Sequence, residues 1–231
     1  MDSQWLHRMG HPSLITFCNG WGMDERPFRP LASLTYDVLM LCDYRRISTS
    51  PDIPKLLQRY QEVSLVSWSM GVSIGQSIFS SCSELFRMKV AINGTLCPIH
   101  NELGIPVDIL TGTARNFSEA SRQKLYTRMC RDRECCAGFQ NNLPVRSLES
   151  QRQELEVLLE MCDCQQRKES IYSHIMIADR DFIMPTANQL RFWKESALCI
   201  FHAQHFPFYL WPTWDALLAE VLHMASASNI A

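Results

Sequence analysis

A serine at position 69 has neighbours that would let it act as a nucleophile. The segment from Val63 to Gly71 reads V-S-L-V-S-W-S-M-G, an apolar run that stops at a serine and is followed by a glycine. This is the pattern G-x-S-x-G with Ser67, also a small residue, in place of the first glycine. Such a serine lies on a tight strand-to-helix turn, where the N–H of Met70 can stabilise an oxyanion. The motif predicts acyl transfer through Ser69, and the alternative is a strand that ends in a polar turn.

An acid should follow a nucleophile of this kind, because the chain order in folds with this motif is Ser, then Asp or Glu, then His. Two aspartates, Asp179 and Asp181, come directly after a late apolar run. We favour Asp181, which lies on a loop that ends at Pro185, whereas Asp179 is nearer the end of the strand. For either aspartate the alternative is a turn former or a helix N-cap.

The general base is expected after the last strand. His205 stands far enough beyond that strand to reach back over Ser69, and apolar residues that could exclude water follow it. His202 is the competitor and lies closer to the sheet. The histidines elsewhere are interpreted as structural or surface residues: His7, His11, His100, His174 and His223.

A second oxyanion donor should come from the loop after the first long strand. That loop contains Trp21 between Gly20 and Gly22, and the glycines allow the unusual backbone turn that would direct the Trp21 N–H inward. The alternative is an ordinary Asn-Gly turn.

Short apolar runs that alternate with helical patterns would position these residues. The predicted strands are 14–18, 37–42, 63–67, 89–92, 173–178 and 197–201, and the predicted helices are 53–60, 71–86, 187–196 and 214–224. Continuous apolar runs between helices indicate a parallel sheet that is covered on both faces.

The segment 111–168 breaks this rhythm and contains only helical patterns, over 118–130 and 148–164. An α/β-hydrolase carries its cap at this place in the chain. We therefore predict an α/β fold of the α/β-hydrolase class, with a mostly parallel central sheet and helices on both faces. Residues 1–110 and 169–231 would form the core, and 111–168 an inserted helical cap.

Composition narrows the class of protein. The chain has 231 residues, which suits one domain, and its net charge of −2 does not suggest a nucleic-acid partner. No apolar run reaches the ~20 residues that span a bilayer, and the N-terminus lacks the pattern of a signal peptide. We therefore expect no membrane partner and a cytoplasmic location.

The chain has ten cysteines, and a disulfide framework is not expected in a chain of this size without a secretory signal. Several lie in or beside apolar segments, and five others cluster at positions 130, 135, 136, 162 and 164. The cluster spacings, C-x4-C-C and C-x-C, do not match the usual C-x2-C pairs of zinc sites, so no metal is predicted.

With these residues assembled, the chain resembles the BioG family of pimeloyl-acyl-carrier-protein methyl ester esterases. The matching segments are Phe17 to Asp24, Asp43 to Arg45, Ser67 to Gly71, Ala91 to Thr95, Gly104 to Pro106, Asp181 to Pro185, Ala187 to Gln189, Arg191 to Trp193 and His205 to Phe208. They cover nearly the whole chain apart from the N-terminal tail and the cap.

The resemblance implies a function and a site. Ser69 would be the nucleophile, His205 the base and Asp181 its partner, while Trp21 and Met70 would supply the oxyanion N–H groups. The implied reaction is hydrolysis of the methyl ester of pimeloyl-acyl carrier protein by a serine carboxylesterase in biotin synthesis, with no metal or organic cofactor. Alternatives are a broader carboxylesterase, an acyl thioesterase, or a scaffold whose triad is vestigial.

The cap is rich in arginine, and carrier proteins are acidic. The candidates for docking a carrier that brings the pimeloyl methyl ester are Arg115, Arg122, Arg128, Arg131, Arg133, Arg146 and Arg152. The alternative is a solvated helix face on which these arginines pair with Glu119, Glu134, Glu149 and Glu154.

Overall fold

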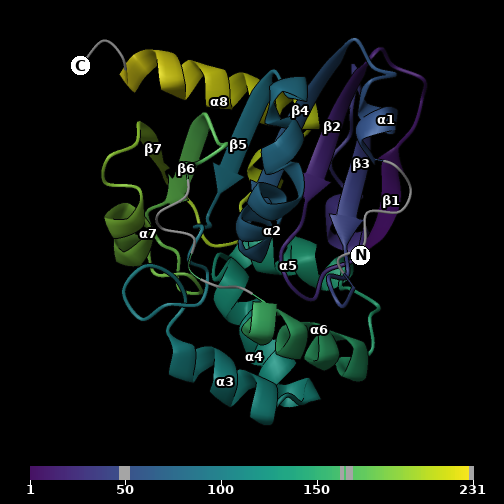
Figure 1. The fold of residues 1–231 in the computed structure, drawn as a ribbon. Helices are drawn as coiled ribbons and strands as arrows, with labels where there is room; N and C mark the ends of the chain where they lie inside the picture. The colour runs from purple at the N-terminus through teal and green to yellow at the C-terminus, as the bar shows by residue number, and fades with distance from the viewer. Residues whose placement is uncertain (47–52, 162–163, 165–168, 229–231) are drawn as a thin grey trace.

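One sheet with strand order β1-β3-β2-β4-β5-β6-β7 forms the centre of the protein (Figure 1). Its strands are β1 (Asp2–His7), β2 (Ser13–Cys18), β3 (Tyr36–Cys42), β4 (Glu62–Trp68), β5 (Met88–Ile92), β6 (His174–Ala178) and β7 (Leu198–Phe201). This computed structural model describes residues 1–46, 53–161, 164 and 169–228. Neighbouring strands pair in parallel except β1 and β3, so the mostly parallel sheet that the sequence predicts is confirmed.

Strand β1 is the one element of the sheet that the sequence did not predict. It pairs antiparallel with β3 at the sheet edge, where Asp2 faces Cys42 in the register. Its residues are exposed or half-buried, so it lacks the continuous apolar run that marks the central strands.

Helices cover both faces of the sheet, as predicted. They are α1 (Ile53–Leu57), α2 (Met70–Phe79), α7 (Thr186–Phe192) and α8 (Trp214–Ser228), with short 3₁₀ turns η1 (Arg26–Phe28), η2 (Ser80–Leu85) and η3 (Phe208–Leu210). In Figure 1, α2 lies in front of the sheet and α8 behind it. The helix predicted over 71–86 ends early at Phe79 and continues as η2, because its last part is a serine-rich run with low helix propensity.

The cap consists of α3 (Val107–Arg115), α4 (Glu119–Cys130), α5 (Arg133–Asn141) and α6 (Leu148–Met161), which lie beyond the carboxyl ends of the strands (Figure 1). The sequence predicted two of these helices. It missed α3 and α5, which are short, and it placed the cap boundary a few residues after the start of α3. The end of the predicted helix over 148–164 and the boundary at 168 fall partly outside the described residues. We propose that the cap begins at Val107.

A disulfide joins Cys97, in the loop after β5, to Cys164, with the Cα atoms 4.1 Å apart. The sequence analysis expected no disulfide framework and missed this pair, because 67 residues separate the two positions and no local spacing links them. Among the described residues the thiols of Cys18, Cys42, Cys82, Cys130, Cys135 and Cys136 are free. No helix in the described ranges is both long and apolar enough to span a membrane.

Candidate active site

Ser69 lies on the turn between β4 and α2, with φ 58° and ψ −125°. These angles are strained for a residue with a side chain. The turn packs tightly, because a Cβ at Gly71 would come within 2.3 Å of the carbonyl oxygen of Cys18. Ser67, fully buried, pairs in register with Cys18 on the neighbouring strand β2. A small residue therefore satisfies the packing at position 67, and the elbow forms without the first glycine.

His205 approaches Ser69 from the loop after β7. Its Nε2 lies 3.0 Å from the Ser69 Oγ. The backbone carbonyl of His205 accepts hydrogen bonds from the Trp68 indole N–H at 2.8 Å and from the Asn93 amide at 3.0 Å. These two donors fix the backbone of His205, from which the imidazole reaches Ser69.

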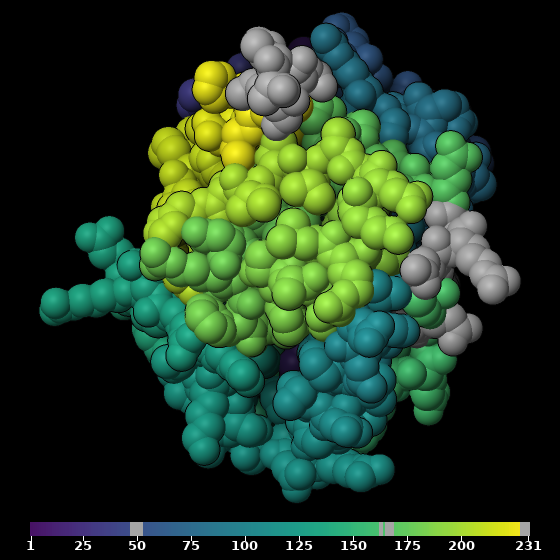
Figure 2. Space-filling model, turned by 90° about the vertical axis from the view of Figure 1, so that its left-hand side faces the viewer, coloured from purple at the N-terminus to yellow at the C-terminus, as the bar shows by residue number. Residues whose placement is uncertain are grey.

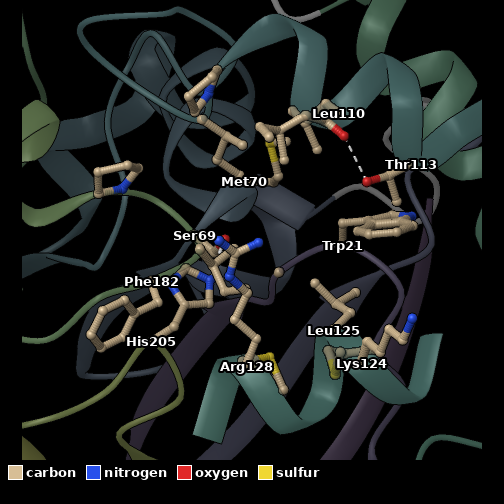
Figure 3. Close-up of a pocket in the computed structure, with 18 of the residues that line it drawn as sticks. Trp21, Ser69, Met70, Leu110, Thr113, Lys124, Leu125, Arg128, Phe182 and His205 are labelled. Carbon is tan, nitrogen blue, oxygen red and sulfur yellow. Dashed lines mark hydrogen bonds between the residues drawn. The ribbon is translucent and has the colours of Figure 1, made fainter. Parts of the chain in front are cut away.

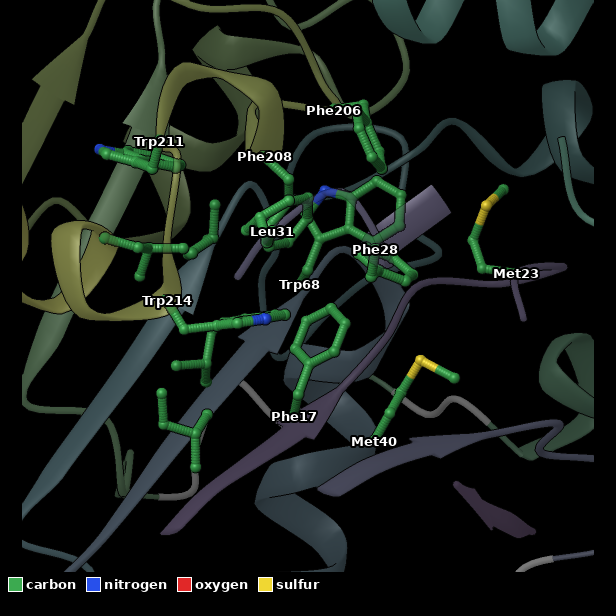
Figure 4. Close-up of a cluster of buried hydrophobic side chains, with 14 of the residues drawn as sticks. Phe17, Met23, Phe28, Leu31, Met40, Trp68, Phe206, Phe208, Trp211 and Trp214 are labelled. Carbon is green, nitrogen blue, oxygen red and sulfur yellow. The ribbon is translucent and has the colours of Figure 1, made fainter. Parts of the chain in front are cut away.

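Aromatic side chains pack around Phe206 and Phe208, which follow His205 on the same loop (Figure 4). Phe206 and Phe208 lie in edge contacts with the Trp68 ring, each with centroids 5.5 Å apart. Phe28 packs against all three rings. Such rigid packing limits where the histidine backbone can move.

Asp181 completes the arrangement. Its Oδ2 lies 2.7 Å from the His205 Nδ1 and also accepts a hydrogen bond from the Gln189 amide at 2.9 Å. Its Oδ1 accepts the backbone N–H groups of Ile183 and Met184, both at 2.9 Å. A buried carboxylate with four donors is fixed in orientation, and it can stabilise a positive charge on the imidazole.

The competing aspartate and histidine form a separate pair. Asp179 Oδ2 lies 2.9 Å from His202 Nδ1, and both side chains are exposed. Burial alone would raise the pKa of Asp179, but hydrogen bonds from His202 and the Ala203 N–H outweigh it, so this pKa lies below its ordinary value. The structure brings Asp181 and His205, rather than Asp179 and His202, to Ser69.

The two predicted oxyanion donors lie beside the serine. Gly20, Trp21 and Met70 line the same pocket as Ser69 and His205. Within the described part of the chain, neither the Trp21 nor the Met70 backbone N–H donates to another group. At Gly20 a Cβ would come within 2.8 Å of the Trp68 ring, so the loop needs glycine there to approach the elbow.

The pocket above these residues has a volume of about 390 Å³. Figure 3 shows it between α3, which carries Leu110 and Thr113, and α4, which carries Lys124, Leu125 and Arg128. Figure 2 looks toward a hollow between the teal helices of the cap and the lime-green segments that follow β6. Most of the lining is apolar, which suits an acyl chain.

The predicted cap arginines separate into two groups. Arg122 pairs with Glu119, Arg146 with Glu154, and Arg152 with Glu149 and Glu156. Arg128, by contrast, lines the pocket. The Arg131 guanidinium lies 3.9 Å from the centroid of the Phe182 ring.

Arg115 ends α3, Arg133 begins α5, and within the described residues neither joins an ion pair. The pairing alternative therefore holds for part of the set and fails for Arg115, Arg128, Arg131 and Arg133. Lys124, exposed one turn before Arg128 on the pocket lining, was missed by the sequence reasoning.

Four other residues of the site were also missed. Asn93 joins the β6 end to the histidine loop, and Gln189 holds Asp181. Gln151 and Glu154 of α6 contact the loop of Trp21. Asn93 and Gln189 fall in segments that match the BioG family, which was a usable signal. Nothing in the sequence marks Gln151, and it suggested Glu154 only as a partner of the cap arginines. Among the described residues no three histidines, cysteines or carboxylates gather as a metal site.

Residues 1–217 match the family described as "Pimeloyl-ACP methyl esterase BioG". A crystal structure of BioG from Haemophilus influenzae is similar with a TM-score of 0.83 and 28% identity, over 94% of this chain and 99% of that one. An uncharacterized protein of the same organism is 30% identical over 88% of this chain and 93% of its own length.

A malonyl-[acyl-carrier protein] O-methyltransferase of Bacteroides fragilis is 31% identical over 78% of this chain. The chain spans only 36% of the length of that relative. The enol-lactonase of Burkholderia xenovorans is similar in fold, with a TM-score of 0.65 and 13% identity over 97% of this chain and 96% of that one. The predicted α/β-hydrolase fold class is confirmed.

These names correct the predicted activity. The family description and the Bacteroides relative differ in the reaction that they state, and the relative is named for methyl transfer, not for hydrolysis of a methyl ester. By that finding, the prediction of a serine carboxylesterase that cleaves the pimeloyl-carrier methyl ester is wrong, and the broader carboxylesterase and acyl thioesterase gain no better support. The prediction was wrong for a physical reason. Ser69, His205 and Asp181 determine which atom attacks, whereas the cap determines which substrate is bound next to that atom.

Proposed function

The chain belongs to the BioG family, and from this premise we propose that Ser69 forms a covalent acyl intermediate with an acyl group that an acyl carrier protein delivers. The observation that carries the proposal is the position of His205. Its two ring nitrogens lie 3.0 Å from the Ser69 Oγ and 2.7 Å from the Asp181 Oδ2. One imidazole can therefore take the hydroxyl proton while a buried carboxylate stabilises its charged form.

The acylation step follows from this geometry. The Ser69 Oγ attacks the acyl carbonyl carbon while His205 removes its proton. The resulting oxyanion accepts hydrogen bonds from the N–H groups of Trp21 and Met70, each contributing about 3 kcal/mol. The bond from the carbonyl carbon to the leaving oxygen or sulfur then breaks, and His205 returns the proton to the leaving atom. No metal or organic cofactor takes part in this step.

The carrier as the source of the acyl group is supported by the family and by the malonyl-carrier name of the Bacteroides relative. The pocket supports it as well, since its apolar walls suit an acyl chain and its rim carries Lys124 and Arg128. Arg131 lies next to that rim, over Phe182. We propose that Lys124, Arg128 and Arg131, with Arg115 at the end of α3, attract the acidic surface of the carrier.

Rapid-quench mass spectrometry tests the acylation. The purified chain is mixed with malonyl-carrier and longer acyl-carrier proteins, quenched in acid and digested, with Ser69→Ala as control. We expect an acyl adduct on the Ser69 peptide with at least one carrier and none with Ser69→Ala. A gain of one methyl group on malonyl-carrier in the presence of S-adenosylmethionine, with no adduct on Ser69 under any condition, would overturn the proposal.

Charge reversal tests the docking surface. Arg128→Glu with Arg131→Glu should lower the rate of Ser69 acylation by a carrier about 10-fold or more, because the paired surfaces then repel. The rate of labelling by a small neutral fluorophosphonate should stay within about 2-fold. Arg152→Glu is the matched control, since this cap arginine lies on α6 and pairs with Glu149 and Glu156. Equal losses with carrier and fluorophosphonate would contradict carrier docking at this surface.

A further inference from the structure

Helix α6 of the cap holds the turn that carries the Trp21 N–H. The Trp21 indole N–H donates to the carbonyl oxygen of Gln151 at 2.7 Å. The Gln151 side-chain amide donates to the carbonyl oxygen of Gly22 at 2.7 Å, and the Gly22 N–H donates to Glu154 Oε2 at 3.0 Å. These three bonds join residues 129 to 132 positions apart in the chain. The turn is therefore fixed by the cap as well as by the sheet.

The two residues of α6 that make these bonds are buried. Gln151 is 1% exposed and Glu154 is 0% exposed. Burial raises the pKa of Glu154 above its ordinary value, while the nearby Arg146 guanidinium and the N–H groups of Tyr44 and Gly22 act in the opposite direction. A buried carboxylate without such donors would strongly destabilise the fold. Glu154 therefore keeps its hydrogen bond to the Gly22 N–H, and this bond holds the N–H in place.

Helix α4 fixes Gln151 in turn. The Gln151 amide also donates to the Tyr126 hydroxyl at 2.9 Å, and its Oε1 accepts a hydrogen bond from Arg122 at 3.3 Å. Both partners belong to the helix that forms one wall of the pocket. This gives Arg122, which the sequence suggested for carrier docking, a contact inside the cap instead.

The backbone geometry explains why the hydrogen bonds from α6 affect the direction of the Trp21 N–H. Gly22 has φ +77°, a left-handed conformation that glycine adopts without steric cost, and its N–H and carbonyl groups are bonded to Glu154 and Gln151. With the Trp21 ring and both polar atoms of Gly22 bonded to α6, little freedom remains for the peptide that carries the Trp21 N–H. A displacement of about 1 Å in such a site can lower the rate about 10²-fold.

We propose that Gln151 and Glu154 are positioning residues for the oxyanion site, through which the cap keeps the Trp21 N–H directed at the group bound to Ser69. This inference rests on the proposed acylation of Ser69. It assigns to α6 a role in the rate of the chemical step and not only in enclosing the pocket.

Inactivation kinetics with a fluorophosphonate test the inference, because the phosphonyl oxygen occupies the oxyanion site during attack by Ser69. The maximal rate of inactivation reports the chemical step, and the half-saturation concentration reports binding in the pocket. Gln151→Leu, which keeps the volume and removes the hydrogen bonds, should lower the maximal rate about 10- to 100-fold. The half-saturation concentration should stay within about 3-fold.

Gln153→Leu is the matched control, since Gln153 lies on the same helix and its side chain bonds to Arg45 and Glu149. It should react at the rate of the wild type. Trp21→Phe removes the indole donor and keeps the backbone N–H, and it should show the same selective loss as Gln151→Leu.

Four results would overturn the inference or its basis. A wild-type maximal rate in Gln151→Leu, or a loss confined to half-saturation, would overturn the positioning role and leave the proposed function intact. If circular dichroism shows that Gln151→Leu is unfolded, Trp21→Phe decides by the same criteria. An equal loss in Gln153→Leu would also overturn it, since the effect would then belong to the helix as a whole. No labelling of the wild type at Ser69 would overturn the proposed function and this role with it.

Discussion

Two histidine–aspartate pairs lie at neighbouring strand ends, and only one of them contacts a serine. His205 and Asp181 are 24 residues apart in the chain, and the distance from Nδ1 to Oδ2 is 2.7 Å. His202 and Asp179 are 23 residues apart, and the distance between the same atoms is 2.9 Å. The side chains of the first pair are 3% and 0% exposed, and those of the second are 68% and 38% exposed. Residue type, spacing and contact distance are nearly the same in both pairs, so none of these alone makes a catalytic site.

The surroundings make the difference. Asp181 accepts hydrogen bonds from two backbone N–H groups and from Gln189, and His205 is held by Trp68 and Asn93. The exposed pair has one further donor, the Ala203 N–H, and water competes for both partners. Pre-organisation therefore separates a proposed catalytic pair from a surface ion pair.

The largest expected contrast comes from the histidines. His205→Ala should lower the rate of Ser69 labelling by a fluorophosphonate about 10³-fold or more, because in the described part of the chain no other base lies within hydrogen-bond distance of the Ser69 hydroxyl. His202→Ala should change that rate less than about 2-fold. Time courses followed by intact mass spectrometry give both rates. Comparable losses in the two variants would remove the distinction between the pairs.

The aspartates should give a smaller contrast. Asp181→Asn keeps the size of the side chain but can disturb the imidazole tautomer and removes the stabilising charge, so the labelling rate should fall about 10²- to 10³-fold. Asp179→Asn should leave it nearly unchanged. The same labelling assay decides, and a larger effect at Asp179 than at Asp181 would reverse our assignment of the acid.

The smallest effect concerns the pH dependence of stability. Because the pKa of Asp179 is lower in the folded protein than its ordinary value of 3.8, its contribution to stability is present at neutral pH and is lost as pH falls through the folded pKa. Asp179→Asn should therefore lower the urea midpoint slightly at pH 7 and not at all at an acidic pH below the folded pKa. Urea titrations at both pH values measure this. A difference between variant and wild type that persists unchanged in acid would contradict it.

The sequence could predict the sheet, the serine turn and the order of the acid and the base, because each follows an apolar run that marks a strand end. It could not decide firmly between Asp179 and Asp181, since the choice depends on burial and on donors such as Gln189 that come from elsewhere in the fold. Strand β1 lacked an apolar run and was missed.

The cap was the least predictable part. The contacts of Gln151 and Glu154 with the Trp21 turn, and the disulfide between Cys97 and Cys164, join positions far apart in the chain. The predicted substrate came from family likeness, and the residues of the triad carry no information about the acyl group or the leaving group. The predicted activity was therefore the part that the comparison with the Bacteroides relative corrected.

Mapping of the fluorophosphonate adduct tests the central claim most directly. The wild type is labelled to completion, digested and analysed by tandem mass spectrometry, beside Ser69→Ala, His205→Ala and His202→Ala. We predict one adduct, on Ser69, that forms at the wild-type rate in His202→Ala, forms far more slowly in His205→Ala and is absent from Ser69→Ala. An adduct on a different residue, or labelling that does not depend on His205, would contradict the account.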